Sequence, residues 1–241
     1  MQTILLASGY NKRVRHLFPN LPKVMFPLGG QPYLKYWLDM LLSQETDVII
    51  LVQYLSPVIK KYVQESYPKE FNNGKIKLVE RPENLGPVRA IAQLKNMIDS
   101  EFAIVYCDTL FRVNLDSAKK VLGDDFAGLT FITADELNMF DKMEVLIDEK
   151  RRLATEFQPN AYGHTNGWMD VGQIYKKEAL DLFKTAPDMA EHFNLSAWPE
   201  LIKQKKLTYW KVGPVFDIGT EKNYLATNEI FKTKGLSALE K

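Results

Sequence analysis

The first 110 residues alternate between short apolar runs and segments whose apolar residues recur three and four positions apart. Apolar runs of this length indicate buried β-strands, and the helical spacing indicates amphipathic helices between them. The strands are expected at 2–7, 47–52, 75–80 and 102–106. The helices are expected at 32–42, 56–67 and 87–98. Strand–helix alternation of this kind predicts a mostly parallel sheet with right-handed crossovers and helices on both faces.

The second half of the chain is less regular. Strands are expected at 128–133, 143–148, 168–175 and 207–212, and helices at 177–184, 197–205 and 221–232. A charged turn at 148–152 joins two of these strands. No repeat, linker or low-complexity stretch interrupts the pattern. The sequence therefore predicts one α/β domain over residues 1–241, with a Rossmann-like, mixed, mostly parallel sheet.

Charge and cysteine content exclude several classes of protein. Lys and Arg together number 31 against 30 Asp and Glu, whereas dedicated nucleic-acid binders carry a basic excess. The single cysteine, Cys107, lies in an apolar run, so no intrachain disulfide forms and a buried residue is expected rather than a nucleophile. No run approaches the ~20 apolar residues of a membrane span, and the N-terminus has no apolar signal region. A cytoplasmic protein is expected.

A basic loop follows the first strand. The apolar run Ile4–Ala7 stops at Ser8-Gly9, and Lys12, Arg13 and Lys23 follow within 15 positions. A buried strand that ends in a small-residue turn leaves backbone N–H groups at its carboxyl end. Together with the cations these groups predict an anion site for phosphates. The alternative is an ordinary basic surface loop.

The same loop resembles the opening motif of the sugar-1-phosphate and phosphocholine nucleotidyltransferases, L-A-G-G-x-G-T-R-L followed by P-K. Gly9, Arg13 and Lys23 fall on matching positions, whereas Ser8 and Asn11 stand where the family has glycines. Asparagine tolerates positive φ better than most residues, but its side chain blocks the close approach that glycine permits.

Two acidic motifs extend the resemblance over the whole chain. Asp108 follows the strand at 102–106 in a segment that resembles the family's G-D-T-L, and Asp217 lies in a D-I-G-T segment. In isolation, an Asp after a strand is usually a turn cap. The resemblance implies instead that both are Mg²⁺ ligands, although 217 − 108 = 109 positions separate them.

The resemblance also implies roles for the remaining residues. Arg13 and Lys23 would act in catalysis with Asp108 and Asp217, and Arg81 and Gly86 would lie beside the base. The implied nucleotide-binding set is Ala7, Ser8, Gly9, Arg13, Lys23, Arg81 and Gly86. Arg89 stands where relatives have a small residue, and it either changes the nucleotide contacts or faces outward. The resemblance does not choose between purine and pyrimidine.

The acceptor side matches the family less well. Glu156 lies in a segment that resembles the family's E-K-P, but the lysine is absent. Asp170 and Gly172 lie in a segment related to the family's N-x-G-I-Y strand, and they complete the implied acceptor set. Tyr162 and Trp168 are near Asp170 in the sequence. Three roles are open for these aromatic residues: binding a cationic acceptor, binding a sugar ring, or packing in the core.

The expected function is therefore a Mg²⁺-dependent nucleotidyltransferase. It would join a nucleoside triphosphate to a phosphorylated small molecule and release pyrophosphate. The preferred acceptor is a sugar-1-phosphate, by resemblance to enzymes of surface-polysaccharide pathways. Residues 1–110 would form the nucleotide-binding half and 111–241 the acceptor-binding half. One alternative is a CTP-dependent enzyme for a phosphocholine-like or phosphoamino-acid acceptor. Another is a homologue that binds nucleotide or sugar without catalysis. The segment 207–210 forms either a homodimer interface or a buried sheet edge.

Overall fold

The computed structural model describes residues 1–134, 144–158, 168–189 and 196–239. Contacts within the chain divide it into two compact units. Unit A consists of Gln2–Arg81, Val105–Arg112 and Pro214–Lys241, and unit B consists of Pro82–Ile104 and Val113–Gly213 with Met1. Strand β6 (Glu101–Tyr106) runs from unit B into unit A. The division into a nucleotide half and an acceptor half remains a prediction.

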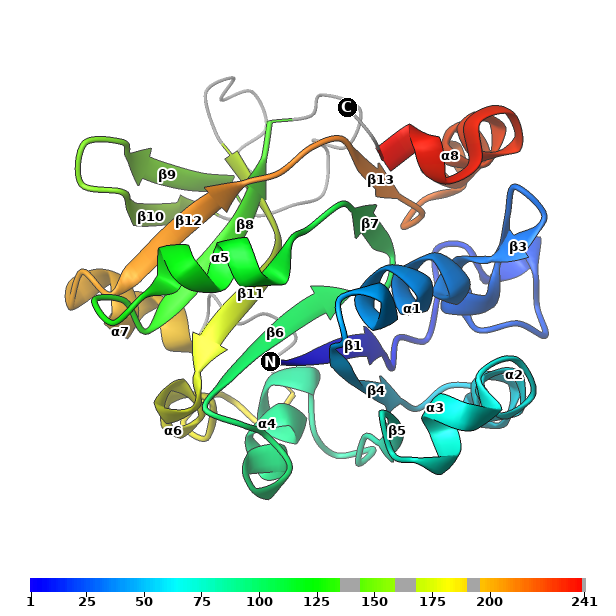
Figure 1. Ribbon diagram of the computed structural model, residues 1–241, viewed down its shortest axis with the longest axis horizontal. Helices are drawn as coiled ribbons and strands as arrows, with labels where there is room; N and C mark the ends of the chain where they lie inside the picture. Colours follow the sequence, from blue (N-terminus) through cyan, green and yellow to red (C-terminus); the bar gives the residue numbers. More distant parts are fainter. Residues whose placement is uncertain (135–143, 159–167, 190–195, 240–241) are drawn as a thin grey trace. The chain divides into compact units, whose positions relative to one another are not determined.

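Unit A contains the parallel strands expected from the N-terminal alternation (Figure 1). Strand β1 (Gln2–Ala7) pairs with β4 (Asp47–Val52), which pairs with β5 (Ile76–Glu80), all in parallel. The connecting helices are α1 (Tyr33–Ser43), α2 (Ser56–Ser66) and the short α3 (Pro68–Asn72). The predicted boundaries of α1 and α2 agree with the structure to within one residue.

Unit A also contains two small antiparallel pairs. Strand β2 (Pro27–Leu28) pairs with β3 (Gln31–Pro32), and β7 (Thr109–Phe111) pairs with β13 (Val215–Asp217). Helix α8 (Glu221–Lys234) follows β13, and 3-10 turns lie at Arg15–Leu17, Lys23–Met25 and Gly235–Leu239. The sequence pattern does not predict β7 or β13, because the three residues of each strand are too few to show an alternation.

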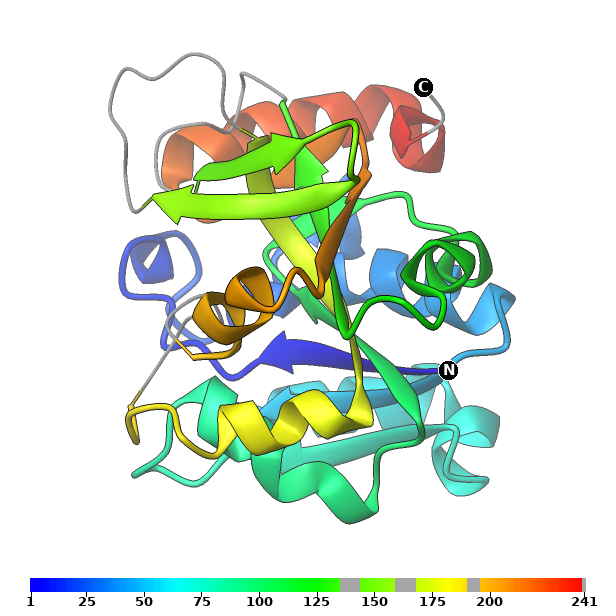
Figure 2. The same ribbon diagram turned by 90° about the vertical axis from the view of Figure 1, so that its left-hand side faces the viewer.

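The antiparallel pairs of the large sheet lie in unit B (Figure 2). Strand β11 (Trp168–Lys176) is antiparallel to β8 (Gly128–Thr133) and β9 (Glu144–Asp148), and β12 (Leu207–Lys211) is parallel to β8. The hairpin of β9 and β10 (Leu153–Gln158) turns at the charged segment 148–152, as expected. The helices are α4 (Pro87–Ala92), α5 (Leu115–Leu122), α6 (Leu180–Phe183) and α7 (Ala197–Lys203), with 3-10 turns at Gln93–Asn96 and Lys177–Ala179. The predicted α/β class, a mixed and mostly parallel sheet with helices, is confirmed.

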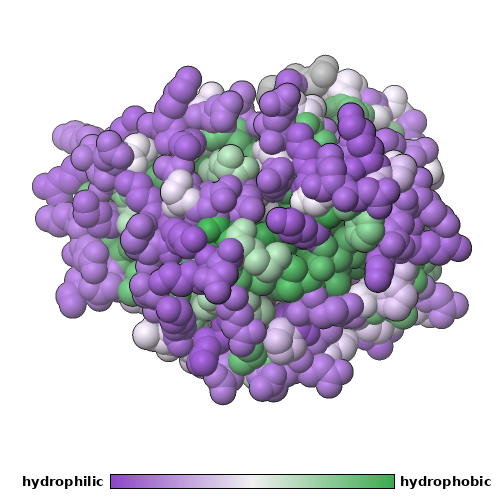
Figure 3. All heavy atoms as spheres, turned by 60° about the horizontal axis from the view of Figure 1, so that its bottom comes forward, coloured by the Kyte–Doolittle hydropathy of each residue, from purple (hydrophilic) through white to green (hydrophobic). Residues whose placement is uncertain are grey.

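Aromatic side chains fill the core of each unit. In unit A, Trp37 is fully buried and meets Phe111 edge to face. In unit B, Trp198 donates its indole N–H to the Tyr175 hydroxyl at 2.9 Å, which satisfies both buried polar groups. Hydrophilic side chains cover most of the face drawn in Figure 3, with a hydrophobic area between them. No helix among the described residues is long and apolar enough to cross a membrane.

Candidate active site

The two acidic motifs meet in unit A. Thr109 of β7 lies opposite Asp217 of β13, and the backbone N–H of Ile218 donates to the carbonyl oxygen of Asp108 at 2.9 Å. The antiparallel pair therefore brings together two carboxylates that are 109 positions apart (217 − 108). The sequence contains both motifs, and the structure shows how the fold joins them.

Donors on both sides of the turn after β13 hold the Asp217 carboxylate. Its Oδ1 atom accepts from the backbone N–H of Gly219 at 2.7 Å and from the side-chain amide of Asn223 at 3.0 Å. A Cβ atom at residue 219 would lie 3.0 Å from Oδ1, so a glycine there allows this close approach. Thr227 donates its hydroxyl to the Asp217 carbonyl oxygen at 3.0 Å. The first turns of α8 thus fix the orientation of this carboxylate.

Lys23 forms an ion pair with Asp108. Its ammonium Nζ donates to Asp108 Oδ2 at 2.7 Å, and the Lys23 side chain is 17% exposed. Burial alone would lower the pKa of Lys23, but the charge and hydrogen bond of Asp108 outweigh it and raise the pKa above its ordinary value. Lys23 is therefore a fixed cation beside the acidic pair at neutral pH.

Sequence reasoning missed Tyr33, the first residue of α1. Its hydroxyl donates to the Phe216 carbonyl oxygen at 2.9 Å, one residue before Asp217. Burial, together with the charges of Asp108 and Asp217, raises the pKa of Tyr33 well above its ordinary value, so Tyr33 remains a neutral donor. Nothing in its sequence context signals this contact, because it joins residues 183 positions apart.

Cys107 is buried, as expected. Its thiol donates to the carbonyl oxygen of Leu6, and burial raises its pKa well above the ordinary value. A buried protonated thiol is a poor nucleophile.

The loop after β1 folds around Asn11. This residue has a φ of +56°, as its tolerance of positive φ suggested, and its carbonyl accepts from the backbone N–H groups of Val14 and Arg15 at 3.0 and 2.8 Å. The Arg15 guanidinium donates to the Tyr10 carbonyl at 2.6 Å and lies 4.5 Å from the centre of the Tyr54 ring. The side chain of Arg13 lies on the exposed surface of this loop, whereas Ala7 and Ser8 are buried and Gly9 is exposed.

Arg81 lies at the end of β5 and is 8% exposed. Its guanidinium donates to Gln53 Oε1 and, at 3.5 Å, to the Ser8 carbonyl oxygen. Arg81 is therefore close to Ser8, with which it was grouped in the implied nucleotide-binding set, and it contacts the turn after β1.

The other predicted residues belong to unit B. The backbone N–H of Gly86 donates to the Asp188 carbonyl at 2.6 Å, and the Arg89 guanidinium binds the Ala186 carbonyl at 3.1 Å and the Asp188 carboxylate at 2.8 Å. Arg89 was expected either to change the nucleotide contacts or to face outward. In the structure its guanidinium contacts the segment 186–188.

Asp170, predicted on the acceptor side, is buried at an irregular point of β11. The register between β11 and β8 shifts between Asp170 and Gly172, and the Asp170 carboxylate accepts from Thr130 at 2.7 Å and from the Gln173 amide. The backbone N–H of Gly172 lies 3.4 Å from the same carboxylate. The Asp170 carboxylate oxygens therefore accept hydrogen bonds from neighbouring residues of unit B.

The other acceptor-side candidates differ in exposure. Glu156 is exposed on β10. The Lys211 ammonium lies 4.4 Å from the centre of the Trp168 ring and 2.6 Å from the Glu149 carboxylate. A cation of the chain itself therefore lies on one face of Trp168. Tyr162 lies outside the described residues.

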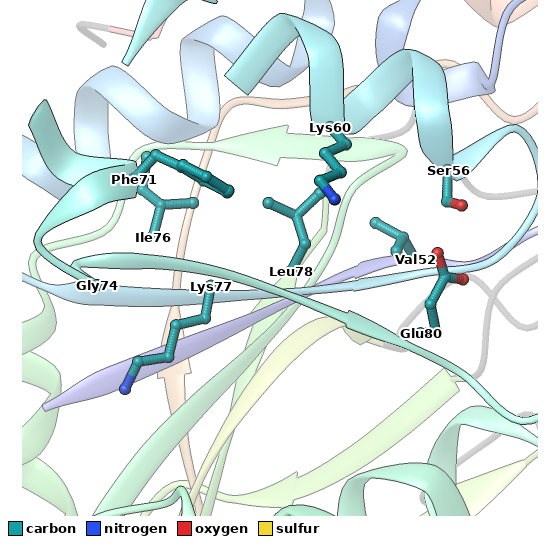
Figure 4. Close-up of a pocket in the computed structure, with 9 residues that line it drawn as sticks. All are labelled: Val52, Ser56, Lys60, Phe71, Gly74, Ile76, Lys77, Leu78 and Glu80. Carbon is teal, nitrogen blue, oxygen red and sulfur yellow. The ribbon is translucent and has the colours of Figure 1, made fainter. Parts of the chain in front are cut away.

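A pocket of about 370 Å³ lies elsewhere in unit A, between α2, α3 and β5 (Figure 4). Apolar side chains such as Ile76 and Leu78 line it together with the charged side chains of Lys60 and Glu80. The full lining is Val52, Ser56, Lys60, Phe71, Gly74, Ile76, Lys77, Leu78 and Glu80. None of the predicted site residues lines this pocket, so it is separate from the acidic pair.

The acidic pair has the chemistry of a site for a hard divalent cation. Two carboxylates could supply oxygen ligands, Asp108 just before β7 and Asp217 at the end of β13. Two donors already orient the Asp217 carboxylate. No group of three or more His, Cys, Asp or Glu side chains forms a metal cage within the described part of the chain. A cation held by these two carboxylates would take its remaining ligands from water or phosphate, as Mg²⁺ does in proteins.

Comparisons with known proteins match the chain to one family of enzymes. The nucleotidyl transferase family model matches residues 2–233. The bifunctional protein GlmU of Methanococcus aeolicus is 25% identical, over 98% of this chain and 57% of its own length. The D-glycero-alpha-D-manno-heptose 1-phosphate guanylyltransferase of Campylobacter jejuni is 28% identical, over 67% of this chain and 70% of its own length. The chain thus spans a little more than half of the GlmU relative.

Solved structures show the same fold. HddC from Yersinia pseudotuberculosis superposes with a TM-score of 0.78 at 20% identity, covering 96% of this chain and 99% of its own. A putative glucose-1-phosphate thymidylyltransferase from Bacillus anthracis gives a TM-score of 0.80 at 14% identity, covering 96% of this chain and 95% of its own.

Proposed function

Because this chain belongs to the nucleotidyl transferase family, we propose that it joins a nucleoside triphosphate to a phosphorylated small molecule and releases pyrophosphate. The observation that carries the proposal is the cluster of Lys23 at the end of the basic loop, Asp108 just before β7 and Asp217 on β13. One cation and two carboxylates beside a basic loop suit a reaction between two polyanions.

In the proposed reaction, a phosphate oxygen of the acceptor forms a bond to the α-phosphorus. The bond from that phosphorus to the bridging oxygen breaks, and pyrophosphate leaves with the electron pair. The acceptor phosphate is ionised at neutral pH, so the step requires no general base. This agrees with a site that consists of carboxylates and an ammonium group.

The chain's own residues would bind and orient the phosphates. Lys23 would neutralise charge at the α-phosphate, and Arg13 would bind the departing phosphates. Asp108 and Asp217 would hold Mg²⁺, which when bound reduces the repulsion between the two sets of phosphates. Asn223 and Gly219 would keep the Asp217 carboxylate in one orientation during turnover.

We favour a sugar-1-phosphate as the acceptor. The support comes from relatives whose names specify such substrates, including the heptose 1-phosphate guanylyltransferase and a mannose-1-phosphate guanyltransferase of Pichia angusta, 23% identical. Gly86, Glu156, Asp170 and Gly172 remain proposed ligands of the base and the acceptor.

A pyrophosphate-release assay tests the proposal. Purified protein with Mg²⁺ is given each of the four common nucleoside triphosphates against sugar-1-phosphates, phosphocholine and phosphoamino acids. We expect release that depends on one triphosphate and one sugar-1-phosphate and that is lost in Asp108→Asn. Release with phosphocholine alone would overturn the sugar assignment. Absence of release from every pair would overturn the activity.

A further inference from the structure

Asn11 connects three parts of the loop in unit A. Its backbone is in the left-handed region at φ +56°, and its carbonyl accepts from the backbone N–H groups of Val14 and Arg15, which closes the turn just before the 3-10 turn at Arg15–Leu17. A glycine would adopt this conformation with less strain. The backbone alone therefore gives no reason for an asparagine here.

The side chain of Asn11 supplies that reason. In the amide orientation that satisfies both neighbours, its nitrogen donates to the Gly9 carbonyl at 3.1 Å, and its oxygen accepts from the backbone N–H of Lys23 at 2.5 Å. One amide thus ties the turn after β1 to the far end of the loop. A glycine at residue 11 has no group that forms either bond.

The second of these bonds leads directly to the acidic pair. Lys23 follows Pro22, and its backbone N–H is held by Asn11 while its ammonium is held by Asp108 at 2.7 Å. A continuous set of bonds therefore runs from Gly9 through Asn11 and Lys23 to Asp108.

We infer that Asn11 is a positioning residue for the proposed reaction, which sets the place of Lys23 before the nucleotide binds. A loop that is ordered in the free protein loses less conformational entropy when it closes on a ligand. The side-chain amide performs this function at a position where glycine would leave the loop free. The inference rests on the proposed function, because it assigns Lys23 to the phosphates.

The test compares Asn11→Gly with Glu45→Gly. Both substitutions relieve a positive φ, +56° and +55°, but Glu45 is exposed between α1 and β4. We expect Asn11→Gly to raise the KM for the triphosphate about tenfold with a smaller change in kcat, the loss expected for about one hydrogen bond. Glu45→Gly is expected to leave both constants unchanged.

Amide hydrogen exchange at Lys23 gives a readout independent of turnover. We expect the Lys23 amide to exchange faster in Asn11→Gly than in the wild type and in Glu45→Gly, since its acceptor is removed. Unchanged exchange at Lys23 would overturn the inference, as would faster exchange with an unchanged KM.

The two proposals fail in different ways. If the wild type released no pyrophosphate with any pair, the proposed function would fail. Exchange at Lys23 and the dissociation constant of the triphosphate, measured in the wild type and in Asn11→Gly, would then decide the inference. A dissociation constant that does not change would overturn it.

Discussion

At the scale of single residues, the Lys23–Asp108 ion pair keeps a positive charge beside the carboxylates of the site. Both side chains are partly buried, and each stabilises the charged form of the other. The folded pKa of Lys23 is raised above 10.5, so the contribution of the pair to stability is present below pH 10.5 and is lost as the pH rises through the folded pKa. Across neutral pH Lys23 therefore stays charged, and this cation is kept beside the two carboxylates.

Replacing Lys23 by Ala removes this cation. We expect kcat/KM for the triphosphate to fall by roughly 10²–10³, the usual effect of losing one charge-stabilising donor in an active site. Steady-state kinetics on the productive substrate pair measure the change. Lys35→Ala is the matched control, since Lys35 pairs with Asp39 at 2.6 Å within α1, where both side chains are partly exposed. An equal loss in the control would contradict a specific role for Lys23.

The sequence allows several of these residues to be recognised, but not their contacts. Lys23, Asp108 and Asp217 lie in motifs that are visible in one chain. The bonds from Tyr33 to Phe216 and from Asn223 to Asp217 cannot be predicted, because a hydroxyl or an amide finds its acceptor only after the elements pack. The motifs specify residue types, and tertiary packing decides which donors reach them.

At the scale of elements, the start of α8 supports the acidic pair. Thr220 caps the helix by accepting from the Asn223 backbone N–H at 3.2 Å, and Asn223 holds Asp217 with its side chain. Helix α5 in unit B has a comparable cap, in which Asn114 accepts from the Ser117 backbone N–H at 2.8 Å. The two caps satisfy the same kind of helix-end donor.

We therefore expect Thr220→Ala and Asn114→Ala to differ in activity but not in stability. Each should lower the free energy of unfolding by about 1 kcal/mol, the usual effect of losing a side-chain cap. Thr220→Ala should also lower kcat severalfold, because the Asn223 amide loses its fixed position beside Asp217. Urea unfolding and pyrophosphate release measure the two effects. Equal activities of the two variants would show that the α8 cap has no bearing on the site.

Element prediction succeeds where segments are long and periodic. Residues 32–42 and 56–67 predict α1 and α2 because their apolar residues repeat over about three turns. Helix α5 is not predicted, although Asn114 is a good N-cap residue. Its eight residues form a short segment with polar turns on both sides. Strand β13 is visible only through its motif, because three residues have no period.

At the scale of the whole molecule, unit A combines segments from the beginning, middle and end of the chain. The basic loop, β7 and β13 come from Gln2–Arg81, Val105–Arg112 and Pro214–Lys241. A ligand that contacts all three segments binds the folded state and not the separated segments. Binding is therefore coupled to the stability of the fold.

We expect the cognate triphosphate with Mg²⁺ to raise the melting temperature. At a concentration 100 times the dissociation constant, a ligand stabilises a fold by about 2.7 kcal/mol. For a chain of this size the shift corresponds to about 5–10 °C. Thermal scans with each triphosphate measure it, and a chelator or Asp108→Asn should remove most of the shift. No shift with any of the four triphosphates would contradict a nucleotide site in unit A.

The pairing of β7 with β13 also determines when the acidic pair can form during translation. Ribosomes add about 5–20 residues per second, so Asp108 is made roughly 5 to 20 seconds before Asp217, 109 residues later (217 − 108). During that interval β7 has no partner strand and Lys23 has one carboxylate to meet instead of two. The nascent chain therefore carries the basic loop well before it can assemble the acidic pair, and the two carboxylates come together only after residue 217 has been added.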